Sequence, residues 1–256
     1  MNQPPSPNLE QLLQRGDIWR GTKAFVHDNN GEDTGHPALN NSLVHNGWPR
    51  ASLIEINLQE MGHGEWLLLA PALRNSIQGL QILINPPALP FAQGLLQAGL
   101  DLDRLLIINA PAKNDFLAAF VEIARAKACS HLLAWQPQQV LNYSEIRKCV
   151  LASNDGSGIY WLLRNSHTTS QSSPAHLRLR ARIHAEYLEV IITKQKGGDQ
   201  SLLNNPLELL LPREWMGYQP HASLGTDSEI HPHINPTKPA TKSGKNTNNI
   251  SRLRGR

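Results

Sequence analysis

Short apolar runs of strand length recur through the middle of the chain, and segments with helical spacing separate them. The runs are mostly continuous and do not alternate with polar residues, which is typical of parallel strands buried on both faces. We therefore predict an α/β fold, with a mostly parallel sheet and helices on both of its faces. The predicted strands are residues 53–58, 80–85, 105–108, 131–135 and 159–163.

The segments between and after these strands predict helices at residues 66–76, 90–98, 115–128 and 144–153. The clearest is 115–128, where apolar residues recur at the three-to-four spacing of a buried helix face. Asn114 or Asp115 is the predicted N-cap of this helix, and Ser144 is the predicted N-cap of the last one. Pro71 should kink the first helix or lie near its first turn.

Beyond Pro174 the pattern changes to alternation, which predicts a β-hairpin from residues 177–184 and 187–193 with one face in water. Residues 207–211 could add an edge strand. The wet face of the hairpin carries a row of arginines, namely Arg178, Arg180 and Arg182. Two interpretations remain open: the row contacts DNA phosphates or an acidic protein, or it is a solvated face balanced by nearby glutamates.

A strand, a glycine turn and a helix follow one another in residues 52–69, which is the layout of a phosphate-binding loop. The side chains that such a loop needs are different here. Glu65 follows the last glycine, where a lysine would reach the phosphates, and Trp66 stands where a hydroxyl would hold magnesium. A carboxylate beside a triphosphate is repelled unless a metal intervenes. We interpret Gly62, Gly64 and Glu65 as a degenerate phosphate loop, and we expect no cofactor, no metal and no catalytic residue.

Charge is divided unevenly along the chain, whose formal net charge is +3. Residues 217–256 hold six Lys or Arg and two Asp or Glu, which gives +4, and the remainder carries −1. The tail has no hydrophobic pattern, so we predict that it is disordered. The nearly neutral body argues against a large nucleic-acid footprint. The predicted organisation is an N-terminal segment 1–15, a folded domain 16–216 and the basic tail 217–256.

Two places outside the predicted strands and helices are candidates for binding a partner protein. Trp19 lies beside charged residues, and it either packs on the body or anchors a partner. The end of the tail combines positive charge with one apolar side chain, as do segments that order on an acidic surface. These candidate residues are Arg252, Leu253, Arg254 and Arg256. A tail that only improves solubility is the alternative.

Cysteine usage and hydropathy indicate where the protein works. Cys129 and Cys149 are too few for a disulfide framework. No apolar run approaches the ~20 residues of a membrane helix. The first residues lack the basic and then apolar order of a secretory signal. We therefore expect a cytoplasmic protein with reduced thiols and no membrane contact.

An ordered series of short segments resembles the ImuA family over about residues 16–200. The segments are residues 17–21, 47–50, 64–65, 86–90, 98–101 and 133–135. ImuA is the bacterial RecA-like accessory protein of damage-induced mutagenesis, and it is related to the cell-division inhibitor SulA. The resemblance implies a RecA-like fold and a non-catalytic role in translesion DNA synthesis during the SOS response. It also implies RecA, ImuB and a DnaE-type error-prone polymerase as partners, with DNA contact weak or indirect.

Two more positions depart from an active RecA core. The resemblance implies a water-activating glutamate after strand 80–85, where Pro86 and Pro87 stand, and a magnesium-binding aspartate at the end of strand 131–135, where Trp135 stands. Phosphoryl transfer depends on electrostatic positioning by these groups, so losing them together with the loop makes the reaction improbable.

The DNA-binding loop of RecA would fall at residues 164–175, which contain one Arg and no Phe, Tyr or Trp. Single-strand binding needs cations and stacking surfaces, so this loop is a poor candidate. Two other functions stay open. One is a SulA-like inhibitor that blocks FtsZ polymerisation, which shares the core but needs no basic tail. The other is a residual ATPase.

Overall fold

The computed structural model describes residues 31–62, 64–76, 78–168, 171–197 and 199–210. The strands are β1 Ser52–Leu58, β2 Leu80–Ile84, β3 Leu105–Ile108, β4 Cys129–Trp135, β5 Ile159–Asn165, β6 Leu177–Ile183, β7 Tyr187–Gln195 and β8 Pro206–Leu210. The α-helices are α2 Pro37–Ser42, α3 Glu65–Asn75, α4 Ala92–Gln97, α5 Lys113–Ala126 and α6 Tyr143–Asp155. The predicted domain boundaries and the predicted disorder of the tail lie outside the described residues and stay predictions.

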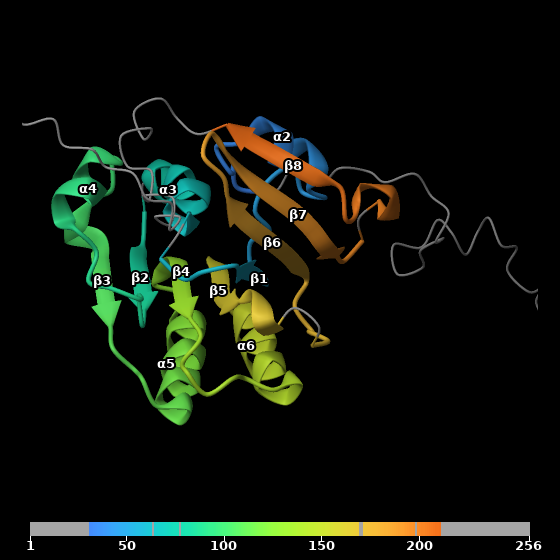
Figure 1. Cartoon of the computed structure of the whole chain (residues 1–256). Coiled ribbons are helices and arrows are strands. Elements are labelled where there is room, and N and C mark those ends of the chain that lie inside the picture. Colours follow the sequence, from blue (N-terminus) through green and yellow to red (C-terminus); the bar gives the residue numbers. More distant parts are fainter. Residues whose placement is uncertain (1–30, 63, 77, 169–170, 198, 211–256) are drawn as a thin grey trace, which may run out of the picture. The chain divides into compact units, whose positions relative to one another are not determined.

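The strands form one sheet in the order β3-β2-β4-β5-β1-β6-β7-β8 (Figure 1). Strands β1 to β6 pair in parallel. Strands β7 and β8 are added antiparallel to β6. The predicted α/β class, the mostly parallel sheet, the hairpin and the added edge strand are therefore confirmed.

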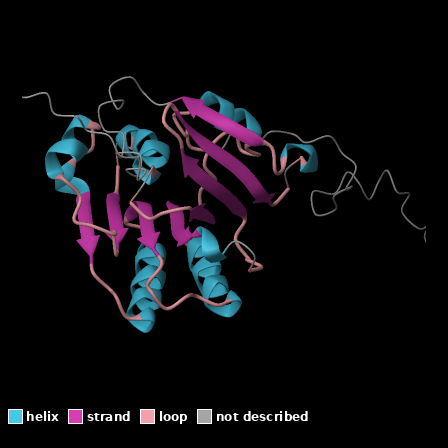
Figure 2. Cartoon of the chain, viewed as in Figure 1, coloured by secondary structure: helices cyan, strands magenta, loops and turns pink. Residues whose placement is uncertain are grey.

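Each face of the sheet has its own apolar core. Helices α3 and α4 cover one face, with Leu69 and Leu95 among the buried side chains. Helices α5 and α6 cover the other face, with Phe120 and Ile146 among the buried side chains. Figure 2 shows these helix pairs on opposite sides of the parallel strands. The strands read as continuous apolar runs because successive side chains enter different cores.

Two predicted helix starts are wrong. Helix α5 begins at Lys113, before the predicted caps at Asn114 and Asp115, because its first turn already closes when the Phe116 N–H donates to the Ala112 carbonyl at 2.9 Å.

Helix α6 is capped by Asn142 and not by Ser144. The Asn142 side chain accepts from the Glu145 N–H at 2.9 Å, and the Glu145 carboxylate accepts from the Asn142 N–H at 2.8 Å. This reciprocal capping box needs Glu or Gln three residues after the cap, which Asn142 has in Glu145, whereas Arg147 stands three residues after Ser144.

Pro71 lies inside α3 and not in its first turn. Proline has no N–H, so it cannot donate to the Leu67 carbonyl four residues earlier. The buried His36 side chain supplies that donor, with its Nε2 3.2 Å from the carbonyl oxygen. Gly35 packs so closely against the Pro71 ring that there is no room for a Cβ atom. Gly35 and His36, which precede the first strand of the sheet, therefore both contact the part of α3 around Pro71.

A second contact holds this segment to the sheet. His131 of β4 is buried, stacks on Trp161 with ring centroids 5.4 Å apart, and contacts Glu32 with Nε2 2.7 Å from Oε1. Trp48 meets the edge of Trp161 at 5.7 Å between centroids. Trp48 and Trp161 thereby belong to the apolar core that α3 and α4 cover.

We expect the His36 contact to make stability depend on pH. Burial lowers the pKa of His36 below its ordinary value of 6.5, and the hydrogen bond to Leu67 offsets part of this shift. The unfolded chain therefore takes up a proton more readily than the folded chain. The stability that His36 contributes is complete above the unfolded pKa and is lost as the pH falls toward the folded pKa.

His36→Gln keeps a donor for Leu67 but cannot titrate. The melting temperature of this variant should therefore fall less than that of wild type when the pH is lowered from 7.5 to 5. His36→Ala also removes the donor and should cost about 1 kcal/mol at pH 7.5. Equal pH slopes for wild type and His36→Gln would contradict the assignment.

Candidate functional site: a closed phosphate loop and a buried ion cluster

The glycine turn lies between a strand and a helix, in the layout that the sequence predicts. It connects the end of β1 to the start of α3. Gly62 and Gly64 both lie in the left-handed region, with φ of 84° and 93°. A side chain at either position would be strained, so the turn requires these glycines. The predicted strand, turn and helix layout is confirmed.

The carboxylate of Glu65 folds back into this turn. Its Oε1 accepts from the Gly62 N–H at 2.8 Å and from the Trp135 indole N–H at 3.3 Å. The side chain is buried, with 1% of the residue surface exposed. The carboxyl group of the chain's own Glu65 therefore occupies the turn.

The three places where the ImuA resemblance implied nucleotide-handling groups lie together at this turn. Pro87 lies beside Gly62, because a Cβ built on Gly62 would be 3.6 Å from the proline Cγ. Trp135 contacts Glu65, and its ring centroid lies 6.2 Å from that of Trp66. Ring and carboxylate atoms thus replace the lysine, hydroxyl and acidic groups that nucleotide chemistry uses.

The hairpin encloses the other side of the turn. A Cβ built on Gly64 would lie 3.3 Å from Leu188 Cδ1 and 3.4 Å from Ile183 Cβ. These residues belong to β6 and β7, which the sequence pattern does not connect with the turn. Their side chains make this wall of the turn apolar, so it offers no donors to a phosphate.

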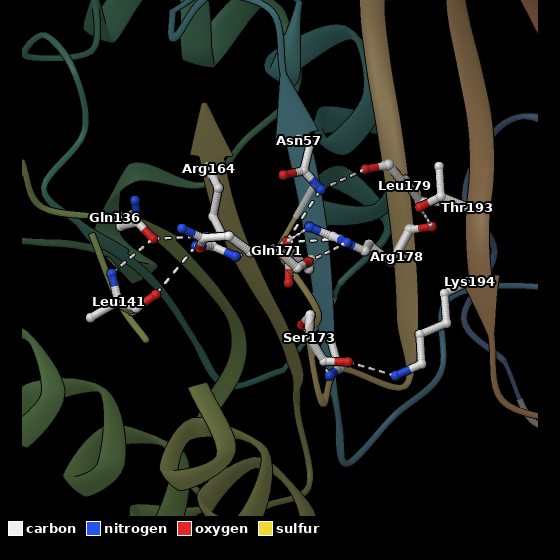
Figure 3. Close-up of polar contacts among 12 residues, drawn as sticks. Asn57, Gln136, Leu141, Arg164, Gln171, Ser173, Arg178, Leu179, Thr193 and Lys194 are labelled. Carbon is white, nitrogen blue, oxygen red and sulfur yellow. Dashed lines mark hydrogen bonds and ion pairs between the residues drawn. The ribbon is translucent and has the colours of Figure 1, made fainter. Parts of the chain in front are cut away.

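A second polar group lies in the middle of the sheet (Figure 3). Glu55 of β1 is fully buried, and its Oε1 is 3.0 Å from Arg164 Nη1 and 3.0 Å from Arg178 Nε. The Asn57 amide donates to the same oxygen at 3.3 Å. Two cations and one anion from β1, β5 and β6 are therefore held together away from water.

The loop after β5 is fastened to this cluster. Arg164 Nη2 donates to the Gln171 side-chain oxygen at 3.1 Å, and Arg178 Nη1 donates to the Gln171 carbonyl at 2.9 Å. Arg164 Nε also donates to Gln136 Oε1 at 2.7 Å. Arg164 is the one arginine in residues 164–175, and it is fully buried. It is not available to bind DNA phosphates.

The structure corrects the prediction for the arginine row. Arg178 is 8% exposed and paired with Glu55, so it belongs neither to a solvated face nor to a docking surface. Arg180 and Arg182 are exposed, as predicted. The missed signal is the spacing of Glu55 and Asn57, which puts two polar side chains on one face of an otherwise apolar strand.

A cavity of about 660 Å³ lies at the carboxyl ends of β2, β3 and β4. Helices that follow neighbouring parallel strands toward opposite faces leave such a crevice between them. Its lining is rich in amides and prolines and includes Asn85, Gln136 and Lys113. Lys113 is engaged by Glu145, with Nζ 2.9 Å from Oε1. The lining therefore offers neutral hydrogen bonding and no acid or base pair of its own.

Metal and thiol chemistry have little support in the part of the chain that the structure describes. There, no group of three His, Cys, Asp or Glu side chains is placed to hold a metal ion. Cys129 and Cys149 are unpaired and buried, and burial raises the pKa of each thiol to about 12. Both thiols stay protonated at neutral pH and are poor nucleophiles.

The predicted partner-binding residues lie outside the described residues, so their role stays a prediction. They are Trp19, Arg252, Leu253, Arg254 and Arg256. None of the described helices has the length and apolar character needed to cross a bilayer.

Comparisons with known proteins do not assign a family to the chain. No family profile and no curated protein matches the chain. Among solved structures, the chain is similar to the crystal structure of SulA from Pseudomonas aeruginosa, with 25% sequence identity and a TM-score of 0.37. The match covers 46% of this chain and 99% of that chain.

Removing Glu55 should destabilise the fold strongly, because it leaves two buried cations without their anion. We expect Glu55→Ala to lower the free energy of unfolding by about 3–5 kcal/mol in urea titrations. Glu189→Ala is the control: it removes a carboxylate from the partly exposed face of β7 and should cost less than about 1 kcal/mol. Similar losses for the two variants would contradict the role of the cluster.

Magnesium-ATP should leave the thermal stability of the wild-type protein unchanged at millimolar concentration. A ligand that binds the folded state raises the melting temperature. The carboxylate in the turn repels the phosphates, and the apolar wall gives them no donors. A reproducible rise with magnesium-ATP, absent with magnesium chloride, would show a residual nucleotide site.

Proposed function

We propose that the chain is a non-catalytic, RecA-like accessory protein of SOS-induced error-prone translesion DNA synthesis. It acts in the cytoplasm through contacts with RecA, ImuB and a DnaE-type polymerase. One observation carries the proposal: the positions expected to handle nucleotide converge on one turn, and that turn holds an indole, a proline ring and the chain's own carboxylate.

The architecture supports the RecA-like part of the proposal. The resemblance implies a parallel core with the phosphate turn after its first strand and a hairpin beyond the DNA-binding loop. The chain has a glycine turn after β1, at the centre of the sheet, and the β6–β7 hairpin follows the loop after β5. The scaffold is retained while its charge chemistry differs.

The chemistry of the turn supports a function without phosphoryl transfer. That reaction needs a metal ion, a cation on the phosphates and a group that orients the nucleophile. At the corresponding positions this chain has Glu65, Trp66, Pro87 and Trp135. None of them supplies positive charge. A protein of this kind acts through the surfaces that its fold presents.

Exposed apolar side chains in the segment that follows Pro87 are suited to such contacts. Leu89 is 83% exposed and Phe91 is 71% exposed, in the segment that joins β2 to α4. Large apolar groups held in water on an ordered surface often mark protein-binding sites. Leu89 also belongs to a segment, residues 86–90, that carries the resemblance to ImuA.

Capture of the partners by the full-length protein tests the proposal. Wild type should retain purified ImuB or RecA, and Leu89→Ser with Phe91→Ser should reduce capture at least several-fold because aromatic and aliphatic anchors dominate binding energy. Leu210→Ser is the control, since Leu210 is 78% exposed at the far edge of the sheet, on β8. Failure of wild type to retain either partner would refute the accessory role.

The same assay tests the predicted tail motif. Arg252→Glu with Arg254→Glu should weaken capture, whereas Lys242→Glu with Lys245→Glu changes the tail charge equally without touching the motif. Equal effects of the two double substitutions would show that the overall charge of the tail, and not the motif, contributes to capture. Sedimentation of FtsZ with and without the protein distinguishes the SulA-like alternative, in which the protein reduces the polymer that pellets.

A further inference from the structure

The cavity at the carboxyl ends of β2, β3 and β4, called the amide crevice below, has the size and the place of a binding site. Its volume of about 660 Å³ is within the range of about 300–1,000 Å³ that is common for ligand pockets. It lies where α4 and α5 follow the neighbouring strands β2 and β3 toward opposite faces, which is the usual place for a ligand in an open α/β sheet. Its carboxamides are Asn85, Asn109, Asn114, Gln136, Gln138 and Gln139.

Asn85 joins the ends of two strands and fixes one wall of the amide crevice. Its N–H donates to the Ile108 carbonyl at 2.9 Å, its Nδ2 donates to the Ala110 carbonyl at 2.7 Å, and its Oδ1 accepts from the Ala110 N–H at 2.6 Å. Its φ of 53° lies in the left-handed region, which asparagine tolerates better than most residues. This wall is formed before any ligand arrives, which lowers the entropy cost of binding.

Gln136 holds a hydrogen-bond donor in a fixed direction at the amide crevice. Its N–H donates to the Leu163 carbonyl at 2.9 Å, and its Oε1 accepts from Arg164 Nε at 2.7 Å and from the Leu141 N–H at 3.3 Å. Both partners of the oxygen are donors only, so the oxygen faces them and the amide nitrogen points away, as Figure 3 shows. In the part of the chain that the structure describes, no group accepts from that nitrogen. An oriented N–H donor is therefore available at the crevice.

The chemistry of the lining favours an uncharged ligand that forms hydrogen bonds. Lys113 is the one charged side chain among the described lining residues, and its Nζ lies 2.9 Å from Glu145 Oε1. None of these lining residues is aromatic, so a nucleobase would find no stacking surface. A carboxamide carries donors and an acceptor, so it can pair with both the N–H and the C=O of a peptide group. An extended, uncharged peptide segment therefore matches the lining better than a base or an ion.

We propose that the amide crevice binds an extended, uncharged peptide segment of a partner protein, with the Gln136 side-chain amide donating to a main-chain carbonyl. The inference rests on the proposed function, because a partner protein supplies the segment. The place agrees with that function: Pro86 lines the crevice, and the exposed Leu89 and Phe91 follow it in the segment that joins β2 to α4. A single partner then makes its apolar and its main-chain contacts on neighbouring parts of the chain.

A capped peptide tests the crevice without any partner protein. The probe is a tetrapeptide of alanine, glycine and serine with an acetyl group at one end and an amide at the other, so it carries no charge. In a titration of wild type to millimolar probe, the NMR signals of the Gln136 side-chain amide should shift saturably and several-fold more than those of Gln78. Gln78 is an exposed control of the same residue type, just before the amino end of β2. Equal shifts at the two residues, including none at either, overturn the proposal, as do shifts of Gln136 with uridine that match those with the peptide.

Gln136→Glu isolates the donor. An oxygen stays within reach of Arg164 and of the Leu141 N–H, so the side chain keeps its anchoring, but the nitrogen that faces the crevice becomes a second oxygen, which repels a carbonyl. The backbone amide signal of Gln138 should respond to the peptide in wild type and in the control Gln78→Glu, and several-fold less in Gln136→Glu. A response of Gln136→Glu as large as that of wild type overturns the proposal. If this variant folds poorly, the comparison of Gln136 with Gln78 in wild type still decides the question.

Capture of ImuB or RecA separates this inference from the proposed function. Gln136→Glu should reduce capture several-fold, and Gln78→Glu should leave it unchanged. Capture that is unchanged in Gln136→Glu overturns the inference while the proposed function stands. If wild type captures neither protein, the proposed function fails, and the peptide titration alone decides whether the crevice binds peptide.

Discussion

Burial of the Glu55 carboxylate constrains the centre of the sheet more than any other contact. A charge removed from water must be met by opposite charge and hydrogen bonds, or the fold loses several kcal/mol. The cations that meet it come from β5 and β6, the two neighbours of β1. Their register is thereby tied to one side chain: Arg178 stands directly opposite Glu55 in the β1–β6 pair. A slip of one residue would turn Arg178 into the opposite, apolar core.

The same strand leads to the second buried carboxylate. Glu55 lies within β1, and Glu65 lies just past the turn that follows it. Both acids find their partners inside the chain: arginines for the first, N–H groups for the second. A core that uses such a turn for phosphate would leave its donors open to solvent. Here the donors are engaged, and the apolar hairpin residues can pack directly against the turn.

The sequence predicts the elements well because their signals are local. Continuous apolar runs mark the parallel strands, and every predicted strand lies within two residues of an observed one. Helix starts are less well predicted, since Asn142 acts through a reciprocal bond with Glu145 that a list of good capping residues does not reveal. Pro71 inside α3 depends on a donor from His36, far away in the sequence. Such compensation is visible only after folding.

For the candidate site, too, some features follow from the local sequence and others depend on the folded structure. That the phosphate turn lacks its usual side chains follows from Glu65 and Trp66 alone. That Glu65 points into the turn, and that Trp135 donates to it, depends on β4 lying near α3, which no local pattern contains. The buried state of Arg178 does not follow from the arginine row, which looks the same whether or not a carboxylate faces it; the signal lies in Glu55 and Asn57 of β1. Which charged side chains pair between strands that are distant in the sequence depends on the register of those strands in the sheet.

The position of the Glu65 carboxyl group in the turn bears on how the protein can be regulated. A ligand shifts a conformational equilibrium only if it binds the two states differently. On the prediction that magnesium-ATP does not bind at the turn, nucleotide offers no such difference and does not act as a switch through this turn. On the proposed function, control must come from the amount of protein made or from the partners that meet its surface. On that proposal, an accessory factor needs no internal nucleotide switch, and a turn whose Gly62 N–H is bound by the chain's own Glu65 suits such a factor.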